Sequence, residues 1–287
     1  MADHAEASAR AAAIQRNPNA DLKPTKTPIA NWQDADAATR NDWDNHEFVT
    51  IDPYEMGRGV WRNYKLLISA TVPRPIALAS TVSADGKQAN LAPFSFWQCA
   101  SIDPPMYSIS FVGRNSNHIL ANLLETKEMC ISMTSDWLVE AANFASTNSP
   151  MNVSEWDLSG LTQKESDLVK PAHVAESPYS VECRLHSTQE FFSKTDPSVQ
   201  TSTLVVVEVV RFHIWEDALG EDRATADVTK LRPVFRAGGS CTAPVQMHLK
   251  YCARPLLENC EMMERSGFYC RLQSNFARLL LRLLATA

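Results

Sequence analysis

Short hydroxyl and amide side chains gather around a predicted β-hairpin in the first half of the chain. An apolar run over residues 76–82 is followed by Ala84-Asp85-Gly86, which has the composition of a tight turn between antiparallel strands. Such groups, placed where two strands lie side by side over an apolar floor, can line a pocket for a polar organic ligand. The polar side chains concerned are Ser80, Thr81, Asn90, Ser95 and Gln98.

A second group of residues could bind an anion. Gly113-Arg114-Asn115-Ser116 reads as a turn, and Ser116 is placed to cap a helix over residues 117–125 with a buried stripe of Ile119, Leu120, Leu123 and Leu124. The free N–H groups of a helix start favour an anion, and Arg114 adds a fixed positive charge. We therefore expect Arg114 and Ser116 to hold a phosphate, although a simple cap and a solvated surface charge would give the same pattern.

Two histidines are weaker candidates for chemistry. His213 lies on a predicted strand ahead of Glu216-Asp217, and His173 lies in a loop before residues 176–178. Each could face a redox ligand, or could be an ordinary half-buried histidine. The sequence has no H-E-x-x-H motif, no C-x-x-C pair and no nucleophile beside a base, so it predicts no metal site. This pattern suits reactions in which a bound cofactor carries the chemistry.

The elements that must position these residues are mostly strands. Period-two alternation predicts strands at 106–112, 128–134, 179–189 and 203–215, a weaker strand at 48–51, and a helix at 137–145. The strand at 179–189 is expected to have one wet face, with Glu182, Arg184 and His186 on it. The strand at 203–215 is apolar on both faces, so its outer face needs a helix, the N-terminal arm or another subunit over it.

Composition limits the class of partner. The chain has 287 residues, 45% of them hydrophobic, a formal net charge of −6 and a sequence pI of about 5.7. An acidic protein is a poor ligand for nucleic acid, which favours a small-molecule partner. Seven scattered cysteines fit reduced thiols, and with no targeting segment predicted at the N-terminus we expect a cytoplasmic location.

Many short motifs over residues 64–239 resemble one known family. The residue groups concerned are Arg74-Pro75-Ile76-Ala77, Ser80-Thr81, Asp85-Gly86, Asn90-Leu91-Ala92-Pro93-Phe94-Ser95, Asp103-Pro104-Pro105, Leu158-Ser159-Gly160-Leu161-Thr162 and Glu182-Cys183-Arg184-Leu185. In this order they resemble the flavin reductase-like proteins with an FMN-binding split barrel, of the flavoredoxin kind. The resemblance implies a mainly β fold with flanking helices, a homodimer, and NADH or NADPH as the donor to FMN.

The resemblance also implies a set of flavin-contacting residues. They are Ser80, Thr81, Asn90, Leu91, Ala92, Ser95, Phe96, Arg114 and Ser116, with His213 as a candidate contact for nicotinamide or the electron acceptor. The chain departs from the family where relatives carry a Lys-Asp-Thr triplet for the phosphate, because Asn117, His118 and Ile119 stand there. Electrons could pass on to free flavin, oxygen or a partner oxygenase, and a non-catalytic FMN carrier or redox sensor is the alternative.

Three segments follow from these patterns. Residues 1–46 read as an extended arm of poor intrinsic order, 47–240 as the split-barrel domain, and 241–287 as an atypical tail where the resemblance has stopped. The tail ends in an apolar run over 276–284 that arginine interrupts and that is too short to span a bilayer. It could cover the barrel, bind a membrane surface or be an irregular gene-model end, and we expect no transmembrane segment.

Overall fold

The structure is a computed structural model, which describes residues 23–25, 38, 42–113, 117–146, 153–238, 242–244 and 247–249. Contacts divide these residues into two units, each taken by itself below. The larger contains residues 47–238 and 242–244. The smaller contains residues 23–46 and 247–249 as far as they are described, and in it β1 (Lys23–Thr25) pairs in parallel with β14 (Met247–Leu249).

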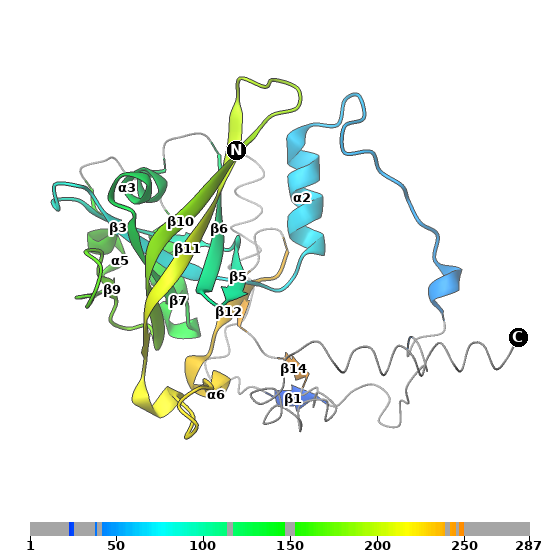
Figure 1. The fold of residues 1–287 in the computed structure, drawn as a ribbon. Coiled ribbons are helices and arrows are strands. Elements are labelled where there is room, and N and C mark those ends of the chain that lie inside the picture. The colour runs from blue at the N-terminus through cyan, green and yellow to red at the C-terminus, as the bar shows by residue number, and fades with distance from the viewer. Residues whose placement is uncertain are drawn as a thin grey trace, which may run out of the picture. The chain divides into compact units, whose positions relative to one another are not determined.

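Seven antiparallel strands form the main sheet of the larger unit (Figure 1). Their order across the sheet is β4-β3-β7-β10-β11-β6-β5. The strands are β3 (Ala77–Val82), β4 (Ala89–Phe94), β5 (Trp97–Ile102), β6 (Pro105–Val112), β7 (Glu128–Met133), β10 (Tyr179–Phe192) and β11 (Gln200–Ile214). Short strands make two further sheets: β2 (Arg74–Pro75), β12 (Val234–Arg236) and β13 (Thr242–Pro244), then β8 (Gln163–Lys164) and β9 (His173–Val174).

Helices flank this sheet. They are α2 (Val60–Ala70), α3 (His118–Thr126), α4 (Val139–Phe144), α5 (Glu155–Ser159) and α6 (Val228–Leu231), with 3-10 turns at Trp43–Asn45, Asp136–Leu138 and Glu216–Ala218. α3 packs against β3 and β4, and α5 packs against β4. The predicted mainly β fold with flanking helices is confirmed.

The main sheet curls into a barrel, and side chains from its two ends pack together in the barrel core. Phe94 at the end of β4 and Phe111 on β6 bring their rings to 4.8 Å, and both pack with buried residues of β3, β7, β10 and β11. The bend at Ser95 and Phe96 carries the chain from β4 at one edge to β5 at the other edge. The backbone N–H of Ser110 donates to the carbonyl of Phe96 at 2.8 Å, which fixes this crossing.

The central hairpin is confirmed. β3 pairs with β4 from Ala77 opposite Phe94 to Val82 opposite Ala89. The N–H of Gly86 donates to the carbonyl of Ser83, and Gly86 has φ +74°, which a glycine adopts without strain. The predicted strands β6, β7, β10 and β11 are also present.

Three local predictions are wrong. Residues 48–51 form no strand, and Phe48 is 97% exposed. Gln98 lies on β5 rather than on the return strand. The cap of α3 is Asn117, whose side chain accepts from Leu120 N at 3.2 Å, so Ser116 is not the cap.

A β-bulge corrects the predicted faces of β11. Val209 lies opposite Cys183 and Arg211 lies opposite Glu182, so Val210 is an extra residue on β11. A bulge of this kind turns every later side chain to the other face. Phe212 therefore shares a face with Val181, although simple alternation had placed it beside Val206, and His213 is directed to the same face as Glu182.

Candidate functional site

Three polar side chains meet where α3 crosses the hairpin. The amide nitrogen of Asn122 on α3 donates to Asn90 Oδ1 at 2.9 Å and to Thr81 Oγ1 at 3.3 Å. Thr81 and Asn90 face each other across β3 and β4, and both are buried. Asn122 is half-buried, so it is the member of this group that reaches the surface.

Glu155 at the start of α5 closes the free edge of β4 beside this group. Its Oε2 accepts from Asn90 Nδ2 at 3.1 Å and, at the long distance of 3.5 Å, from the backbone N–H of Leu91. Ser154 Oγ donates to the carbonyl of Ala89 at 3.0 Å. These contacts occupy backbone groups that an edge strand would otherwise leave unpaired.

Ser80 points to the opposite face of β3, where residues 153–177, which we call the covering segment, lie over the sheet. Ser80 Oγ donates to the carbonyl of Ala172, and Ser132 Oγ accepts from the N–H of Val174 at 3.1 Å. The side chain of Leu91 is buried on this face with Trp156 and others. Ser80 and Leu91 are thus part of the packing of the covering segment.

Glu182 is the anchor of the covering segment. Its side chain is 0% exposed, and its two oxygens accept from three successive backbone N–H groups: Asp167 at 2.7 Å, Leu168 at 2.6 Å and Val169 at 3.2 Å. Burial by itself would raise the pKa of Glu182, but these hydrogen bonds and the one from His213 outweigh it and lower the pKa. The prediction that Glu182 lies on a wet face is therefore wrong.

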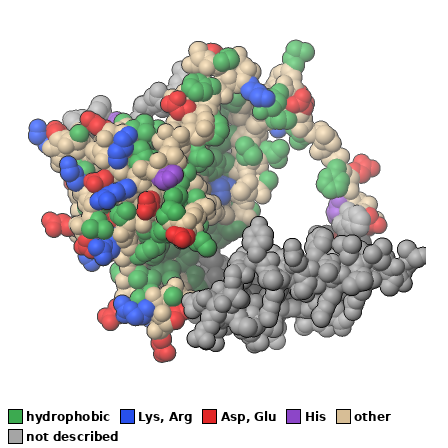
Figure 2. Space-filling model, viewed as in Figure 1, with side chains coloured by type: hydrophobic (Ala, Val, Ile, Leu, Met, Phe, Trp, Pro, Cys, Tyr) green, Lys and Arg blue, Asp and Glu red, His purple; other side chains and the backbone are tan. Residues whose placement is uncertain are grey.

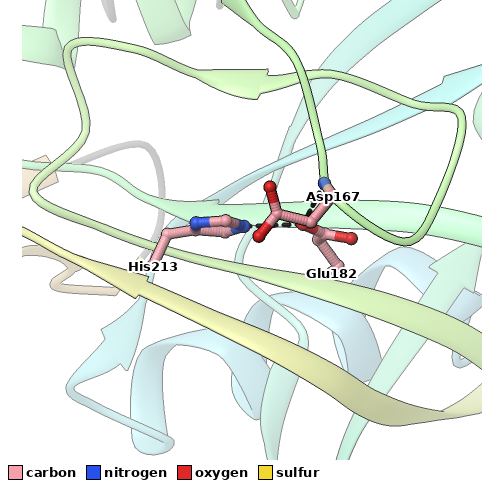
Figure 3. Close-up of side chains that lie close together, drawn as sticks. All are labelled: Asp167, Glu182 and His213. Atoms are coloured by element: carbon pink, nitrogen blue, oxygen red, sulfur yellow. Dashed lines mark hydrogen bonds and ion pairs between the residues drawn. The ribbon is translucent and has the colours of Figure 1, made fainter.

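His213 contacts Glu182 rather than the hairpin. Its Nε2 lies 2.7 Å from Glu182 Oε1, with Asp167 beside the pair (Figure 3). On one side its ring stacks on that of buried His173, with centroids 4.4 Å apart. Burial, with the nearby charge of His213, lowers the pKa of His173 to about 4, so His173 is neutral at pH 7.

The thiol nearest Ser80 is not a reactive one. Cys130 lies opposite Ser80 on β7 and contacts Ser166 Oγ and the carbonyl of Pro171. Burial raises the pKa of Cys130 to about 12, which keeps the thiol protonated and a poor nucleophile at pH 7.

A further group of residues lies at the bend between β4 and β5. Ser95 and Phe96 are half-buried there, and the guanidinium of Arg74 lies 5.8 Å from the centre of the Phe96 ring. Arg74 is buried and donates to the carbonyls of Ile68 and Thr71 at the end of α2. Among the described residues its Nε has no hydrogen-bond partner.

The structure therefore separates the predicted flavin-contacting residues. Thr81 and Asn90 meet, Ala92 packs against the barrel core, and the bend residues lie at the other end of β4. Asn90 and Ser95 are five positions apart in the sequence, which is about 16 Å for an extended chain. His213 lies on β11 and contacts Glu182 and His173, while Arg114 and Ser116 fall outside the described residues.

Sequence reasoning missed Asn122 and Glu155. Asn122 follows Ile119 by three residues, so it is a polar residue beside the buried stripe of α3, and that spacing was a usable signal. Glu155 gave no such signal, because its partner Asn90 is 65 residues away in sequence.

The curled sheet of this topology is a split barrel, with a polar cluster on its β3–β4 hairpin. The sequence profile described as "Flavin reductase like domain" matches residues 69–233, which include all seven strands of the main sheet. The chain belongs to the flavin reductase like domain family.

Individual relatives agree with this assignment. An uncharacterized protein of Halalkalibacterium halodurans is 33% identical over 197 residues, covering 67% of this chain and 90% of the relative. The crystal structure of nitrilotriacetate monooxygenase component B from Bacillus cereus superposes with a TM-score of 0.64 at 28% identity, covering 69% of this chain and 96% of that one. Flavoredoxin of Desulfovibrio vulgaris (Miyazaki F) gives a TM-score of 0.56 at 22% identity over 64% and 93% of the two chains, and shows the same fold.

Family membership gives the chain a flavin-linked oxidoreductase role with a flavin as the cofactor. The polar groups at the hairpin fit such a ligand. Asn122 keeps an amide oxygen that no hydrogen bond in the described residues occupies. Hydroxyl and amide groups are suitable hydrogen-bond partners for the ring edge and ribityl chain of a flavin. No helix of the described residues is long and apolar enough to cross a membrane.

Proposed function

We propose that the protein is an NAD(P)H-dependent reductase that uses FMN, with residues 47–240 as its flavin-binding domain, 1–46 as an arm and 241–287 as a separate tail. A bound flavin supplies the acceptor chemistry, since its ring takes a hydride from a reduced nicotinamide. The polypeptide binds and orients the two partners and keeps water out. The match of the family profile to the whole barrel is the observation that carries this proposal.

Asn122 is the side chain we assign to direct contact with the flavin. It is half-buried, and its nitrogen is already held by Thr81 and Asn90, so its carbonyl oxygen is the group left to accept a hydrogen bond from a ligand. Thr81 and Asn90 act as positioning residues that fix this amide. We assign further contacts to backbone groups of Ala92, in the middle of β4, and to the bend at Ser95 and Phe96, which lies beside the buried Arg74.

The phosphate of FMN is assigned to Arg114 and Ser116, which precede α3 in the sequence. A helix start offers free backbone N–H groups to an anion, and Arg114 supplies a cation. The variant Arg114→Ala should weaken FMN binding about tenfold, the loss of one charge-assisted hydrogen bond, and leave riboflavin binding unchanged. Equal loss for both ligands, or no loss for FMN, would contradict the assignment.

The reaction is tested with purified full-length protein. We expect saturable binding of FMN, and oxidation of NADH or NADPH that rises with added FMN and follows the loss of absorbance at 340 nm. Parallel titrations with FAD decide which flavin is used. If neither nicotinamide is oxidised in the presence of any flavin, the reductase proposal is wrong.

A non-catalytic FMN carrier or redox sensor is the second candidate. Asn117, His118 and Ile119 replace the family's Lys-Asp-Thr triplet, which favours altered handling of the phosphate over a typical turnover cycle. Tight FMN binding with no nicotinamide oxidation is the result expected of a carrier. Nicotinamide oxidation at any appreciable rate would exclude it.

We further propose a homodimer that covers the apolar surface left open by one chain. In the described residues Trp61 and Leu67 of α2 are 71% and 64% exposed, and Phe212 of β11 is 54% exposed. Figure 2 shows hydrophobic side chains along the strands next to α2 and charged ones gathered on the other side of the view. The variant Leu67→Asp should be monomeric by sedimentation, and Lys65→Asp, an exposed change on the same helix, should remain dimeric.

The electron acceptor in this proposal is a partner oxygenase. The similar Bacillus cereus protein is a component of nitrilotriacetate monooxygenase, which supports a two-component arrangement here. Reduced flavin formed by the protein should then support substrate oxidation by a separately purified oxygenase. If electrons reach only oxygen, giving hydrogen peroxide in full yield with every oxygenase tried, this part of the proposal fails.

A further inference from the structure

Asp167, Glu182 and His213 form a cluster that is separate from the hairpin. Their ligand atoms, two carboxylate oxygens and one imidazole nitrogen, all lie within 4.8 Å of one another (Figure 3). They come from the covering segment, β10 and β11. Carboxylate and imidazole together are a ligand set that suits first-row transition cations.

The carboxylate of Glu182 is held in advance of any ligand. Three backbone N–H groups of residues 167–169 bind its two oxygens, and the remaining acceptor position of Oε1 is directed at His213 Nε2, 2.7 Å away. Partners of this kind orient a metal-ligating side chain and raise metal affinity. The three backbone donors can stay in place when an ion takes the position now bridged by hydrogen.

The charges at the cluster favour a cation. Asp167 and Glu182 contribute two carboxylates. In the described residues Asp167 Oδ2 pairs with Arg211 Nε at 3.5 Å, and Glu182 pairs with His213. The Arg211 pair is exposed on both sides and is easily given up. Once the Arg211 pair is given up, an added divalent ion would face two carboxylates.

The cluster is open on one side and closed on the other. The side chain of Asp167 is 59% exposed and that of His213 is 24% exposed, so an ion can enter from solvent. On the inner side lies His173, which is 96% buried, stacks on His213, and has two ring nitrogens without a hydrogen-bond partner in the described part of the chain. Buried polar atoms without a partner are uncommon in folded proteins and are often found at functional sites.

We propose that Asp167, Glu182 and His213 bind one transition cation of the Zn²⁺ type, with water in the remaining position. The ion replaces the hydrogen between Nε2 and Oε1, which leaves to solvent as a proton, and these two atoms separate from 2.7 Å to about 3.3 Å, as tetrahedral bonds of about 2.0 Å require. His213 lies at the end of β11 and is partly exposed, so this shift needs only a small movement of its ring. The bound ion would fasten the covering segment to β10 and β11.

The test is a titration of the full-length, chelator-treated protein with Co²⁺, followed by visible absorption. We expect one equivalent to bind, with the weak bands of nitrogen and oxygen ligation, no thiolate charge-transfer band, and displacement by Zn²⁺. His213→Ala should abolish this binding. Asp167→Asn, a change at an exposed side chain, should weaken it at least tenfold and decides the question if His213→Ala does not fold.

His186→Ala is the matched control, because His186 is an exposed histidine on β10 outside the cluster. It should bind Co²⁺ as the unchanged protein does. The proposal is overturned if the unchanged protein binds no Co²⁺, if its spectrum is that of thiolate ligation, if Asp167→Asn and His213→Ala bind normally, or if His186→Ala loses the ion.

Discussion

Ser80 and Thr81 are neighbours in sequence, yet they face opposite sides of β3 and have different surroundings. Ser80 lies under the covering segment, where its hydroxyl, Ser132, Cys130 and Glu182 all have partners in the same packed layer. Thr81 lies under α3, in a group whose outermost member, Asn122, keeps an acceptor oxygen. Similar side chains thus serve fold stability on one face and remain available to a ligand on the other.

The hydrogen bonding of Ser80 and Thr81 shows how polar residues that stabilise the fold differ from those that can bind a ligand. A buried polar group whose hydrogen bonds are made by backbone or neighbouring side chains stabilises the fold and is not available to the flavin. A group with spare capacity at the surface can bind. Ser80 and Asn122 therefore differ in hydrogen-bond satisfaction, and this difference can be tested by mutation on each face.

The largest effect is expected on the covered face. Glu182→Ala removes the acceptor of three backbone N–H groups, one in a buried and two in part-buried hydrogen bonds, which should lower the free energy of unfolding by about 3 kcal/mol. Urea denaturation followed by circular dichroism measures this, with the exposed Glu190→Ala as the control. If Glu182→Ala lowers the free energy of unfolding no more than the control does, Glu182 does not anchor the covered face.

Asn122→Ala should give the largest effect on the other face. It removes the proposed contact with the flavin, so FMN affinity should fall by about thirtyfold, or ~2 kcal/mol. Fluorescence quenching of FMN provides the measurement. Glu125→Ala, an exposed change on the same helix, should bind FMN normally, and an equal loss in both variants would point to a general effect on α3.

Ser80→Ala sharpens the comparison because it should act on stability alone. The change leaves the carbonyl of Ala172 without its donor, which should cost about 1 kcal/mol of unfolding free energy. Thermal unfolding and FMN titration of the same preparation test both halves. Weaker FMN binding with unchanged stability would reverse the assignment of this residue.

The smallest effect is expected at the exposed rim of the covered face. Arg211→Gln removes an ion pair with Asp167 whose members are both solvent-exposed, so unfolding free energy should change by less than about 0.5 kcal/mol. The same denaturation experiment measures it. If the free energy of unfolding falls by more than about 1 kcal/mol, the Arg211–Asp167 pair helps Glu182 to anchor the covering segment.

Local patterns in the sequence were enough to predict the hairpin, β6, β7, β10 and α3. Alternation and turn chemistry act over a few residues, and here nothing distant opposed them. The bulge at Val210 could not be read in this way, because an extra residue leaves the composition of a strand unchanged while reversing the faces that follow it.

The site was predicted less completely because its partners are distant in sequence. Ser80 contacts Ala172, 92 residues away, and Glu182 became buried because the covering segment folds over an otherwise polar strand face. Resemblance to the family located the hairpin but treated Ser80 and Thr81 as equivalent. Three-dimensional hydrogen bonding separates them.

FMN titration of Thr81→Val and Ser80→Ala in parallel tests the central claim most directly. Both substitutions remove one hydroxyl from adjacent positions of the same strand, so each is the control for the other. The account predicts about fivefold weaker FMN binding for Thr81→Val, or ~1 kcal/mol, and unchanged binding for Ser80→Ala. Equal affinities for the two variants, or the larger loss for Ser80→Ala, would contradict it.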